Sequence, residues 1–444
     1  MFRVNSVPRA RWEMHGCRSR PAPGWPLPWL SGRLKRPMKK EQNILVFNCG
    51  SSSLGCKVFQ SGDVVNASPV FSAKAHRVGT KGSEPSFVQY QGREIFRKIV
   101  VPIPDHRVAA RHILEQIRMN GVIVNLIGHR FVHGGDMFKT AVIIDPIVMK
   151  ELEHCAPLAP IHNPVTLSVI HECQETLPDQ LQYAAFDTSF HASIPDYAYT
   201  YPVPRNIRKR FHFRKYGFHG LSYAYISRAA PAVLGLAPEN AKMVVCHLGT
   251  GGSSVSAIRN GLSMDNSMGY SPLTGLMMST RCGDIDPMLT LYLMVTYDAR
   301  PADLLEMLTE KSGLLGIAGF SSDLRDIIQN VCLKEKDRAE LAFRMYVHRL
   351  RKYIGSYVAA LGGIDALVFT DDIGVTNWLV REKTCQGLKG FGVKLDRDAN
   401  RSASAAIASL ISSKNSLVKV LAMPTEEERV VAEEGAKLTR GMWA

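Results

Sequence analysis

The sequence predicts an α/β protein of two related halves, each built on a mixed sheet flanked by helices. The main observation is a repeat. Residues 44–60 and residues 243–261 both show an apolar strand, a turn rich in glycine and hydroxyl side chains, and a second, alternating strand. Strand-like runs then alternate with helix-like segments along the remaining chain. A length of 444 residues with 45% hydrophobic and 21% charged residues suits a globular protein with more than one domain.

The first forty residues differ in composition from the rest. They contain ten Lys or Arg against one acid, Glu13, so that +9 of the net charge of +14 lies in this segment. Six prolines argue against the amphipathic helix of a transit peptide, although that role and a nucleic-acid-binding arm stay open as alternatives. We interpret residues 1–37 as a disordered basic leader or an over-extended start ahead of Met38.

The nine cysteines indicate reduced thiols. Their number is odd and no two have the C-x-x-C spacing, which argues against a disulfide framework or a zinc site and favours a cytoplasmic location. No apolar run is long enough to cross a bilayer, and we expect neither a membrane nor a nucleic acid as partner.

In the first half, the pattern predicts strands and helices in alternation. The expected elements are a hairpin over 43–60, further strands within 64–100, a helix over 107–119, a strand over 122–127, a helix over 147–155 and a strand over 182–186.

The second half repeats the alternation. The expected elements are a helix over 220–234, a hairpin over 243–265, helices over 286–310 and 336–361, a strand over 366–369 with a turn over 370–374, a strand over 418–423 and a final helix. The final helix begins with glutamates, which a helix dipole favours at that end.

Four short segments combine glycine or proline with histidine or arginine, in loops or at strand ends: 128–130, 160–164, 215–220 and 280–287. Asp187 ends a strand and could bind Mg²⁺. Phosphoryl transfer requires a metal ion, cationic clamps and backbone N–H groups around the phosphates, and the two glycine-rich turns allow such close approach. The P-loop and Rossmann signatures are both missing from the sequence.

These segments, in this order, resemble the acetate kinase family (acetate and propionate kinases), which has the actin/hexokinase/Hsp70-like fold of duplicated ribonuclease-H-like domains. The resemblance covers about 38–444. The matching motifs are Asn48–Ser53, Gly128–Arg130, His162–Pro164, Phe186–Thr188, Gly217–Gly220, Ser267–Gly269, Gly275–Met278, Thr280–Pro287, Ser312–Gly316 and Ser321–Arg325.

The resemblance implies a domain plan and an assembly. Residues 38–189 are expected to form an N-terminal domain that the C-terminal helix 426–444 completes. Residues 190–425 are expected to form a nucleotide-binding domain, with the active site in the interdomain cleft. A homodimer is implied as well.

The resemblance also implies roles at matching positions. Arg130 and Arg281 are expected to clamp the carboxylate and the phosphoryl group, His219 to hydrogen-bond the phosphoryl group, and Asp187 to act in catalysis. Asn48, Asp187 and Glu427 are expected to bind Mg²⁺, for which Mn²⁺ is a possible substitute. The remaining implied residues are His162 and His247 along the phosphate path; Ser51, Ser53, Gly249, Thr250 and Gly251 at the phosphates; Val132, Ile161, Phe218 and Pro272 around the acyl methyl group; and Asp323, Leu324, Arg325, Asp372, Ile373 and Gly374 at the nucleotide, ATP or ADP.

The sequence departs from the family pattern on the nucleotide side. Gly55 replaces the usual Lys, Thr250 replaces an Asn, and Tyr223 replaces a His. Asp371 and Asp372 replace two residues of a glycine-rich loop beside the adenosine, where two carboxylates would repel phosphates.

The expected function is therefore Mg²⁺-dependent, reversible phosphoryl transfer from ATP to acetate or propionate. Two alternatives follow from the departures. In one, pyrophosphate replaces ATP because Asp372 obstructs the adenosine pocket. In the other, the chain is a degenerate relative that binds a ligand without turnover.

Overall fold

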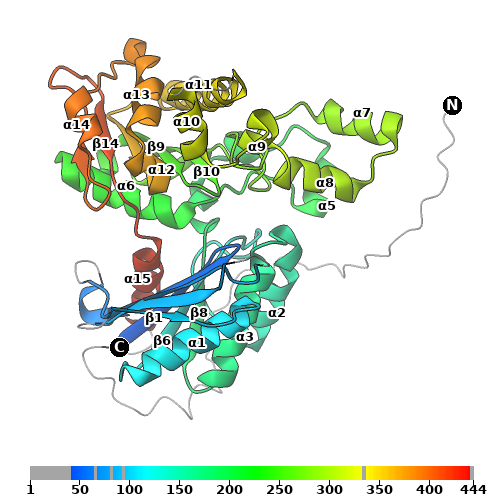
Figure 1. Ribbon diagram of the computed structural model, residues 1–444, viewed down its shortest axis with the longest axis vertical. Helices are drawn as coiled ribbons and strands as arrows, with labels where there is room; N and C mark the ends of the chain where they lie inside the picture. Colours follow the sequence, from blue (N-terminus) through cyan, green and yellow to red (C-terminus); the bar gives the residue numbers. More distant parts are fainter. Residues whose placement is uncertain (1–41, 65–67, 81–83, 93–95, 333–336, 441–444) are drawn as a thin grey trace. The chain divides into compact units, whose positions relative to one another are not determined.

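The computed structural model describes residues 42–64, 68–80, 84–92, 96–332 and 337–440. The leader expected over 1–37 lies outside the described residues. Two mixed sheets form the framework (Figure 1). Within the described residues, no helix is long and apolar enough to cross a membrane.

The first sheet has the strand order β5-β4-β3-β2-β1-β6-β8-β7. Its strands are β1 (Asn43–Cys49), β2 (Ser53–Gln60), β3 (Phe71–His76), β4 (Phe87–Gln91), β5 (Phe96–Val100), β6 (Leu126–Phe131), β7 (Val142–Ile143) and β8 (Leu181–Phe186). β1 pairs antiparallel with β2 and parallel with β6, and β6 pairs parallel with β8. The carboxyl ends of β1, β6 and β8 therefore meet at one edge, which positions the residues that end these strands.

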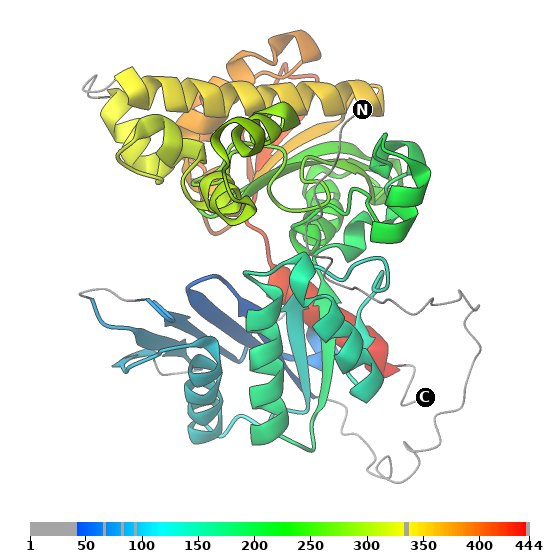
Figure 2. The same cartoon turned by 90° about the vertical axis from the view of Figure 1, so that its right-hand side faces the viewer.

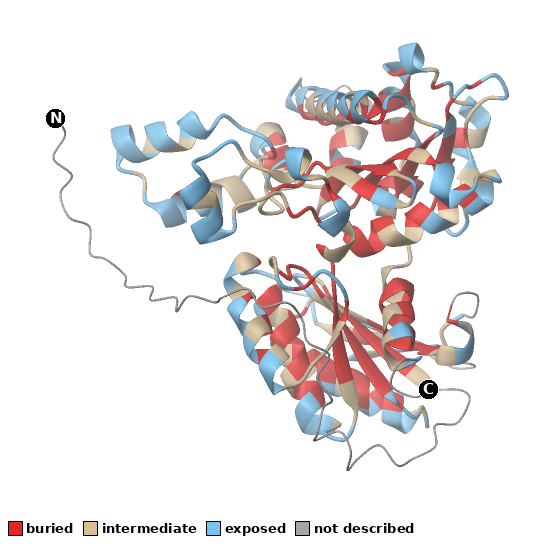
Figure 3. Ribbon diagram, turned by 180° about the vertical axis from the view of Figure 1, so that it is seen from behind, coloured by how far each residue is buried: buried red, intermediate tan, exposed pale blue. Residues whose placement is uncertain are grey.

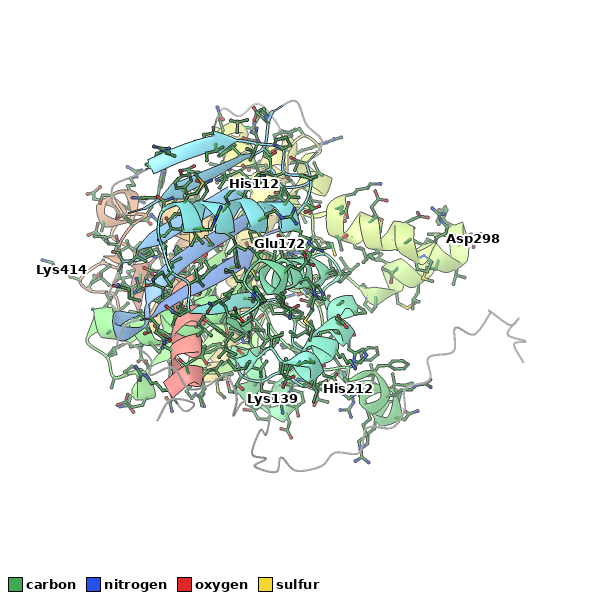
Figure 4. The ribbon with its side chains drawn as sticks, turned by 90° about the horizontal axis from the view of Figure 1, so that it is seen from below. His112, Lys139, Glu172, His212, Asp298 and Lys414 are labelled. Atoms are coloured by element: carbon green, nitrogen blue, oxygen red, sulfur yellow. The ribbon has the colours of Figure 1, made fainter. Side chains whose placement is uncertain are left out.

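Helices cover both faces of this sheet. Helices α1 (His106–Met119) and α3 (Asn163–Thr176) pack on one face, where a buried cluster joins Leu45, Ile113 and Val169. Glu172 of α3 pairs with Arg107 and Arg111 of α1, and Figure 4 labels it beside His112. Helix α15 (Glu427–Arg440) packs on the other face. The sequence pattern did not predict α3.

Strand β6 differs from its prediction. It begins at Leu126 and runs through Gly128 and Arg130, whereas the apolar pattern placed a strand at 122–127. A Cβ atom at Gly128 would lie 2.4 Å from the Tyr183 ring and 2.9 Å from Val431, so glycine is needed inside this strand for β8 and α15 to pack closely.

The second sheet repeats the plan of the first. Its order is β11-β10-β9-β12-β14-β13, formed by β9 (Lys242–Leu248), β10 (Ser253–Arg259), β11 (Leu262–Asn266), β12 (Ala366–Thr370), β13 (Ser409–Leu410) and β14 (Lys419–Ala422). β9 pairs antiparallel with β10 and parallel with β12, as β1 does with β2 and β6. Helix α11 (Asp337–Leu361) packs on one face, and α6 (Gly220–Leu234) on the other (Figure 2). The predicted duplicated α/β fold is confirmed.

Two further predictions need correction. The helix expected over 286–310 is two helices, α7 (Pro287–Tyr297) and α8 (Pro301–Glu310), because Asp298 adopts a left-handed conformation (φ 50°) and Pro301 starts a new helix. The turn expected over 370–374 is mostly the short helix α12 (Asp371–Thr376).

The other α-helices are α2 (Pro146–His154), α4 (Asp196–Tyr199), α5 (Arg205–Phe211), α9 (Gly313–Ala318), α10 (Leu324–Cys332), α13 (Trp378–Gln386) and α14 (Arg397–Arg401).

Candidate active site

Arg130 lies at the centre of a polar cluster at the carboxyl edge of the first sheet. Its Nη2 donates to Asp187 Oδ2 at 2.6 Å, and its Nη1 donates to Asn48 Oδ1 at 2.8 Å. Arg130 and Asn48 are the penultimate residues of β6 and β1, and Asp187 directly follows β8. Burial disfavours the charge of Arg130, but Asp187 and Glu427 outweigh burial and raise the pKa of the guanidinium above its ordinary value.

Two glutamates at the start of α15 complete this cluster. Glu427 Oε2 lies 3.4 Å from Arg130 Nη1, and Glu428 Oε1 accepts from Asn48 Nδ2 at 3.0 Å. Burial raises the pKa of Glu427 despite the opposing effect of Arg130. In Glu428, Lys57 and Asn48 outweigh burial and lower the pKa. The cluster therefore holds more carboxylates than Arg130 alone neutralises, a pattern that suits a bound cation.

The oxygen atoms of this cluster fit Mg²⁺. Mg²⁺ is usually held by one or two carboxylates together with substrate phosphates and water, rather than by a full protein cage. Asp187, Glu427 and Asn48 provide two carboxylates and one amide oxygen around a single arginine. The described residues contain no group of three or more His, Cys, Asp or Glu that could hold a metal ion by themselves. The set therefore suits a metal ion that arrives with a phosphate ligand.

Two histidines stack beside the second sheet. The rings of His219 and His247 lie 4.1 Å apart between centroids, inclined by 27°. His219 Nδ1 is 2.8 Å from Ser254 Oγ, which Tyr223 also contacts at 2.6 Å through its hydroxyl group. Burial lowers the pKa of His219 well below its usual value, and His247, Arg130 and Arg281 lower it further, so His219 is neutral near pH 7.

His247 has the opposite environment. Its Nδ1 is 2.9 Å from Ser222 Oγ, and its Nε2 is 3.1 Å from Asp371 Oδ2. Burial disfavours the imidazolium, but the Asp371 carboxylate outweighs burial and raises the pKa of His247. Burial likewise opposes the charge of Asp371, yet His247 lowers the pKa of Asp371 to about 2. One histidine of the stack is thus held neutral, and the other is stabilised as a cation.

Arg281 lies over the glycine-rich turn between β9 and β10. Its Nη2 donates to the Gly251 carbonyl at 2.6 Å and its Nη1 to the Pro272 carbonyl at 2.8 Å. A Cβ atom on Gly252 would lie 2.6 Å from Arg281 Nη2 and 3.5 Å from His219 Nε2, so both side chains face this turn. Burial lowers the pKa of Arg281 to about 10, and none of its hydrogen bonds to described residues is to a carboxylate.

Both arginines act on one more histidine. Burial, followed by the charges of Arg130 and Arg281, lowers the pKa of His162 to about 4. The same two arginines contribute to the lowered pKa of His219. The charges of Arg130 and Arg281 therefore act on both His162 and His219.

The residues predicted to surround the acyl methyl group are only partly brought together. Val132 and Phe218 join one small buried cluster with Ala159, Met268 and Met278. Ile161 is 51% exposed and lies outside that cluster. Pro272 contributes its carbonyl oxygen to Arg281. Of the four, Val132 and Phe218 share a buried apolar cluster.

The residues predicted at the phosphates lie in two tight turns. In the first turn, the Gly50 N–H donates to the Ser53 carbonyl at 2.8 Å, and Ser51 is exposed. In the second turn, the Gly249 N–H donates to the Gly252 carbonyl at 3.0 Å, and Thr250 and Gly251 form the tip.

The residues predicted at the nucleotide base are less clearly gathered. Arg325 binds Asp323 through its Nη2 at 2.6 Å, next to the buried Leu324 at the start of α10. Asp372 is exposed and, after Asp323, contributes to the raised pKa of Arg325. Ile373 and Gly374 are buried in α12.

The two carboxylates of the altered loop diverge. Asp371 turns toward His247, with a left-handed backbone (φ 64°), and its Oδ2 lies where a Cβ atom of Gly249 would be only 2.3 Å away. The repulsion of phosphates expected from this loop is therefore reduced at Asp371, because His247 neutralises it.

Sequence reasoning missed several residues of this site. Ser222 and Ser254 orient the histidines, and Glu428 holds Asn48, yet no motif marked them. Tyr223 was noted only as a departure, although its hydroxyl group binds Ser254. For Tyr223, the available signal was its position after the Gly217–Gly220 motif. For Glu428, the available signal was the adjacent Glu427.

The chain is similar to known proteins along most of its length. A family model described as the acetokinase family matches residues 43–433. An acetate kinase of Dictyoglomus turgidum is 41% identical over 402 residues, which cover 89% of this chain and 97% of that protein.

Two solved structures are similar throughout. The acetate kinase of Entamoeba histolytica has a TM-score of 0.81 at 39% identity, covering 90% of this chain and 100% of that chain. A propionate kinase of Francisella tularensis has a TM-score of 0.80 at 33% identity, covering 88% of this chain and 98% of that chain.

Proposed function

The chain belongs to the acetokinase family, and from that premise we propose that it reversibly transfers the terminal phosphoryl group of ATP to acetate, giving acetyl phosphate and ADP. Propionate is a second acceptor in this proposal, because one additional methylene group changes binding in an apolar pocket by only about 1–3 kcal/mol.

One observation carries the proposal. Arg281 is a partly buried guanidinium whose hydrogen bonds to described residues reach only carbonyl oxygens, beside the neutral His219. A desolvated cation that lacks a carboxylate partner favours binding of an anion. Arg281 would bind the negative charge that spreads over the phosphoryl oxygens during transfer, and His219 would donate a hydrogen bond to them without adding a charge.

The other residues would position the reactants. Asp187, Glu427 and Asn48 would hold Mg²⁺, which supplies charge neutralisation at the transferring phosphates. Arg130, already fixed by Asp187, would orient the acceptor carboxylate, and Val132 and Phe218 would contact its methyl group. The backbone of the Gly249–Gly252 turn would lie along the donor phosphates.

A second candidate donor is pyrophosphate. The observation that favours it is the carboxylate of Asp371, which lies against Gly249 beside the expected phosphate turn. In this second proposal, the carboxylate would narrow the space left for a longer nucleotide donor. Pyrophosphate would occupy the turn without using the region around Asp372.

We further propose a homodimer that forms through α7. This helix has the sequence PMLTLYLMVTY, and its exposed apolar side chains include Leu291, Tyr292 and Val295, the last of them 86% exposed. Figure 3 shows α7 and α8 as largely exposed. Exposed apolar side chains gathered on one helix are typical of a protein–protein interface. A second copy is the partner that the family suggests.

The cysteines support a cytoplasmic location. The seven cysteines whose side chains the structure describes are all free, and six of them are buried. Free, buried thiols are typical of a reducing compartment.

The test is formation of acyl phosphate, trapped as the hydroxamate. Acetate, propionate and butyrate are each supplied with Mg²⁺ and either ATP or pyrophosphate. Activity with ATP supports the main proposal, activity with pyrophosphate alone supports the second candidate, and inactivity of folded protein in both series rejects the enzyme. Arg281→Ala should lower kcat by about 10²-fold or more. Arg300→Ala, which removes an exposed arginine paired with Asp303, is the matched control and should leave kcat unchanged.

A further inference from the structure

A hollow of about 430 Å³ lies on the first sheet, away from the Arg130 cluster's centre. It is lined by β2, β3, β4, the start of β5 and one residue of α15. Helix α15 packs mainly over β1 and β6 and also contacts β2 and β8, whereas Lys74 and Gln91, further out on the sheet, are exposed. The hollow therefore forms where the covering helix ends and the sheet continues.

Gly55 makes room for this hollow. It lies on β2 between the buried Leu54 and Cys56, so its own position faces the hollow rather than the core. A Cβ atom there would have only ordinary contacts, 3.7 Å from the Asn48 carbonyl oxygen and 4.0 Å from Glu428 Oε1. A side chain at this position would therefore extend into the hollow. The hollow thus depends on one of the positions where the sequence departs from its family.

Two lysines are among the residues that line the hollow. Lys57 and Lys74 line it from adjacent strands, and because Gly55 pairs with Lys74 and Lys57 pairs with Ser72, the two lysines are diagonal neighbours. His76 also lines it and stacks on Phe87, over which Lys98 places its ammonium group at 3.9 Å. Burial, Lys74 and Lys98 lower the pKa of His76, which agrees with a positive potential here.

One acid contributes to the described lining, and it is already engaged. Glu428 Oε2 lies 3.4 Å from Lys57 Nζ, and Glu428 Oε1 accepts from Asn48 Nδ2 at 3.0 Å. Asn48 Oδ1 in turn accepts from Arg130 Nη1 at 2.8 Å. A continuous chain of polar contacts therefore joins the hollow to the candidate active site.

We propose that this hollow binds a small anion carrying two or more negative charges, and that its occupancy reaches Asn48 through Glu428. An anion on Lys57 and Lys74 competes with Glu428 for the Lys57 ammonium group. When Glu428 loses Lys57, its hydrogen bond from the Asn48 amide becomes stronger. That hydrogen bond holds Asn48 away from the donor phosphates. Gln89 and Ser72 offer further hydrogen bonds to the anion, and Phe96, 63% exposed, adds an apolar wall for an organic ligand.

Binding is tested by calorimetric titration of the full chain with inorganic phosphate in one arm and succinate in the other. The Arg281→Ala background weakens anion binding at the candidate active site. On that background, Lys74→Glu and Gly55→Gln should each weaken binding at least about 10-fold, one by charge and one by filling the hollow. Lys414→Glu, a charge-matched change on the exposed loop labelled in Figure 4, should leave binding unchanged. Binding of phosphate alone or succinate alone identifies which oxyanion the hollow prefers.

Absence of binding in both arms, or binding that neither variant weakens, overturns the proposal. The coupling is tested separately and rests on the proposed function. The anion that binds the hollow should raise KM for the phosphoryl donor by about fivefold more in the wild type than in Gly55→Gln. The Gly55→Gln protein serves as the reference because the anion can still compete directly with the donor at its active site. Equal inhibition of the two proteins would reject the coupling. An inactive enzyme would affect only this kinetic arm, because calorimetry needs no turnover.

Discussion

His247 and Asp371 form an ion pair, with Nε2 of the histidine 3.1 Å from Oδ2 of the aspartate. Their strands explain the contact: β9 and β12 are parallel neighbours, and His247 pairs with Thr370, the residue before Asp371. His247 also stacks on the ring of His219, so the ion pair lies next to that histidine. Asp371, which departs from the family pattern, thus favours the charged form of His247 beside His219.

The pair should make stability depend on pH in a defined window. The raised pKa of His247 gives a contribution that is complete below its unfolded value, 6.5, and is lost as pH rises through the folded value. The lowered pKa of Asp371 gives a contribution that is complete above 3.8 and is lost as pH falls through about 2. Asp371→Asn should therefore destabilise the protein most between about pH 4 and 6.5, by about 1 kcal/mol given the partial exposure of Asp371.

Urea unfolding of wild type and Asp371→Asn at several pH values measures this difference. His247→Gln should remove the pH dependence of the difference, since no cation then remains for Asp371. A constant difference from pH 5 to pH 9 would contradict the ion-pair assignment.

Arg130→Ala should be strongly destabilising. It leaves Asp187, 1% exposed, and Glu427 without their arginine, and removing one partner of a buried pair costs about 3–5 kcal/mol. Arg325→Ala breaks an ion pair whose arginine is 65% exposed, and should cost at most about 1 kcal/mol. Chemical denaturation compares the two, and similar losses would show that the Arg130 cluster is solvated.

Gly128→Ala should destabilise the first sheet by about 1–3 kcal/mol or more, because its Cβ would lie 2.4 Å from the buried Tyr183 ring. Gly390→Ala is the matched control, since no atom lies within 4 Å of a Cβ at that position. The readout is the shift in thermal midpoint. A Gly128→Ala protein as stable as the control would mean that β8 and α15 can move apart without cost.

Val295→Glu should weaken self-association through α7 by placing a charge in an apolar interface, by about 10-fold or more in the dissociation constant. Leu417→Glu is the control: Leu417 is 85% exposed, close to the 86% of Val295, but lies far along the chain from α7. Analytical ultracentrifugation over a concentration series gives both constants. A wild type that is monomeric at all concentrations would reject α7 as the interface.

Much of the fold followed from local patterns. The two strand–turn–strand repeats were predicted because alternation and glycine-rich turns are properties of short segments. The start of β6 was misplaced because residues 122–124 are apolar, while Gly128 becomes a strand residue only through its contacts with Tyr183 and Val431. Helix α3 was missed because Pro164 and a mixed polar pattern obscured its start near Asn163.

The candidate site shows the same division. The types and order of the reactive residues, and so the family, could be read from local motifs such as Gly128–Arg130 and Gly217–Gly220, because these are contiguous in the chain. The partners of these residues depend on the folded arrangement. It joins Asp371 to His247 and Glu428 to Asn48, and it leaves Arg281 bonded to carbonyl oxygens. Charge and pKa depend on distances between residues far apart in sequence, and those distances exist only once the two sheets have formed.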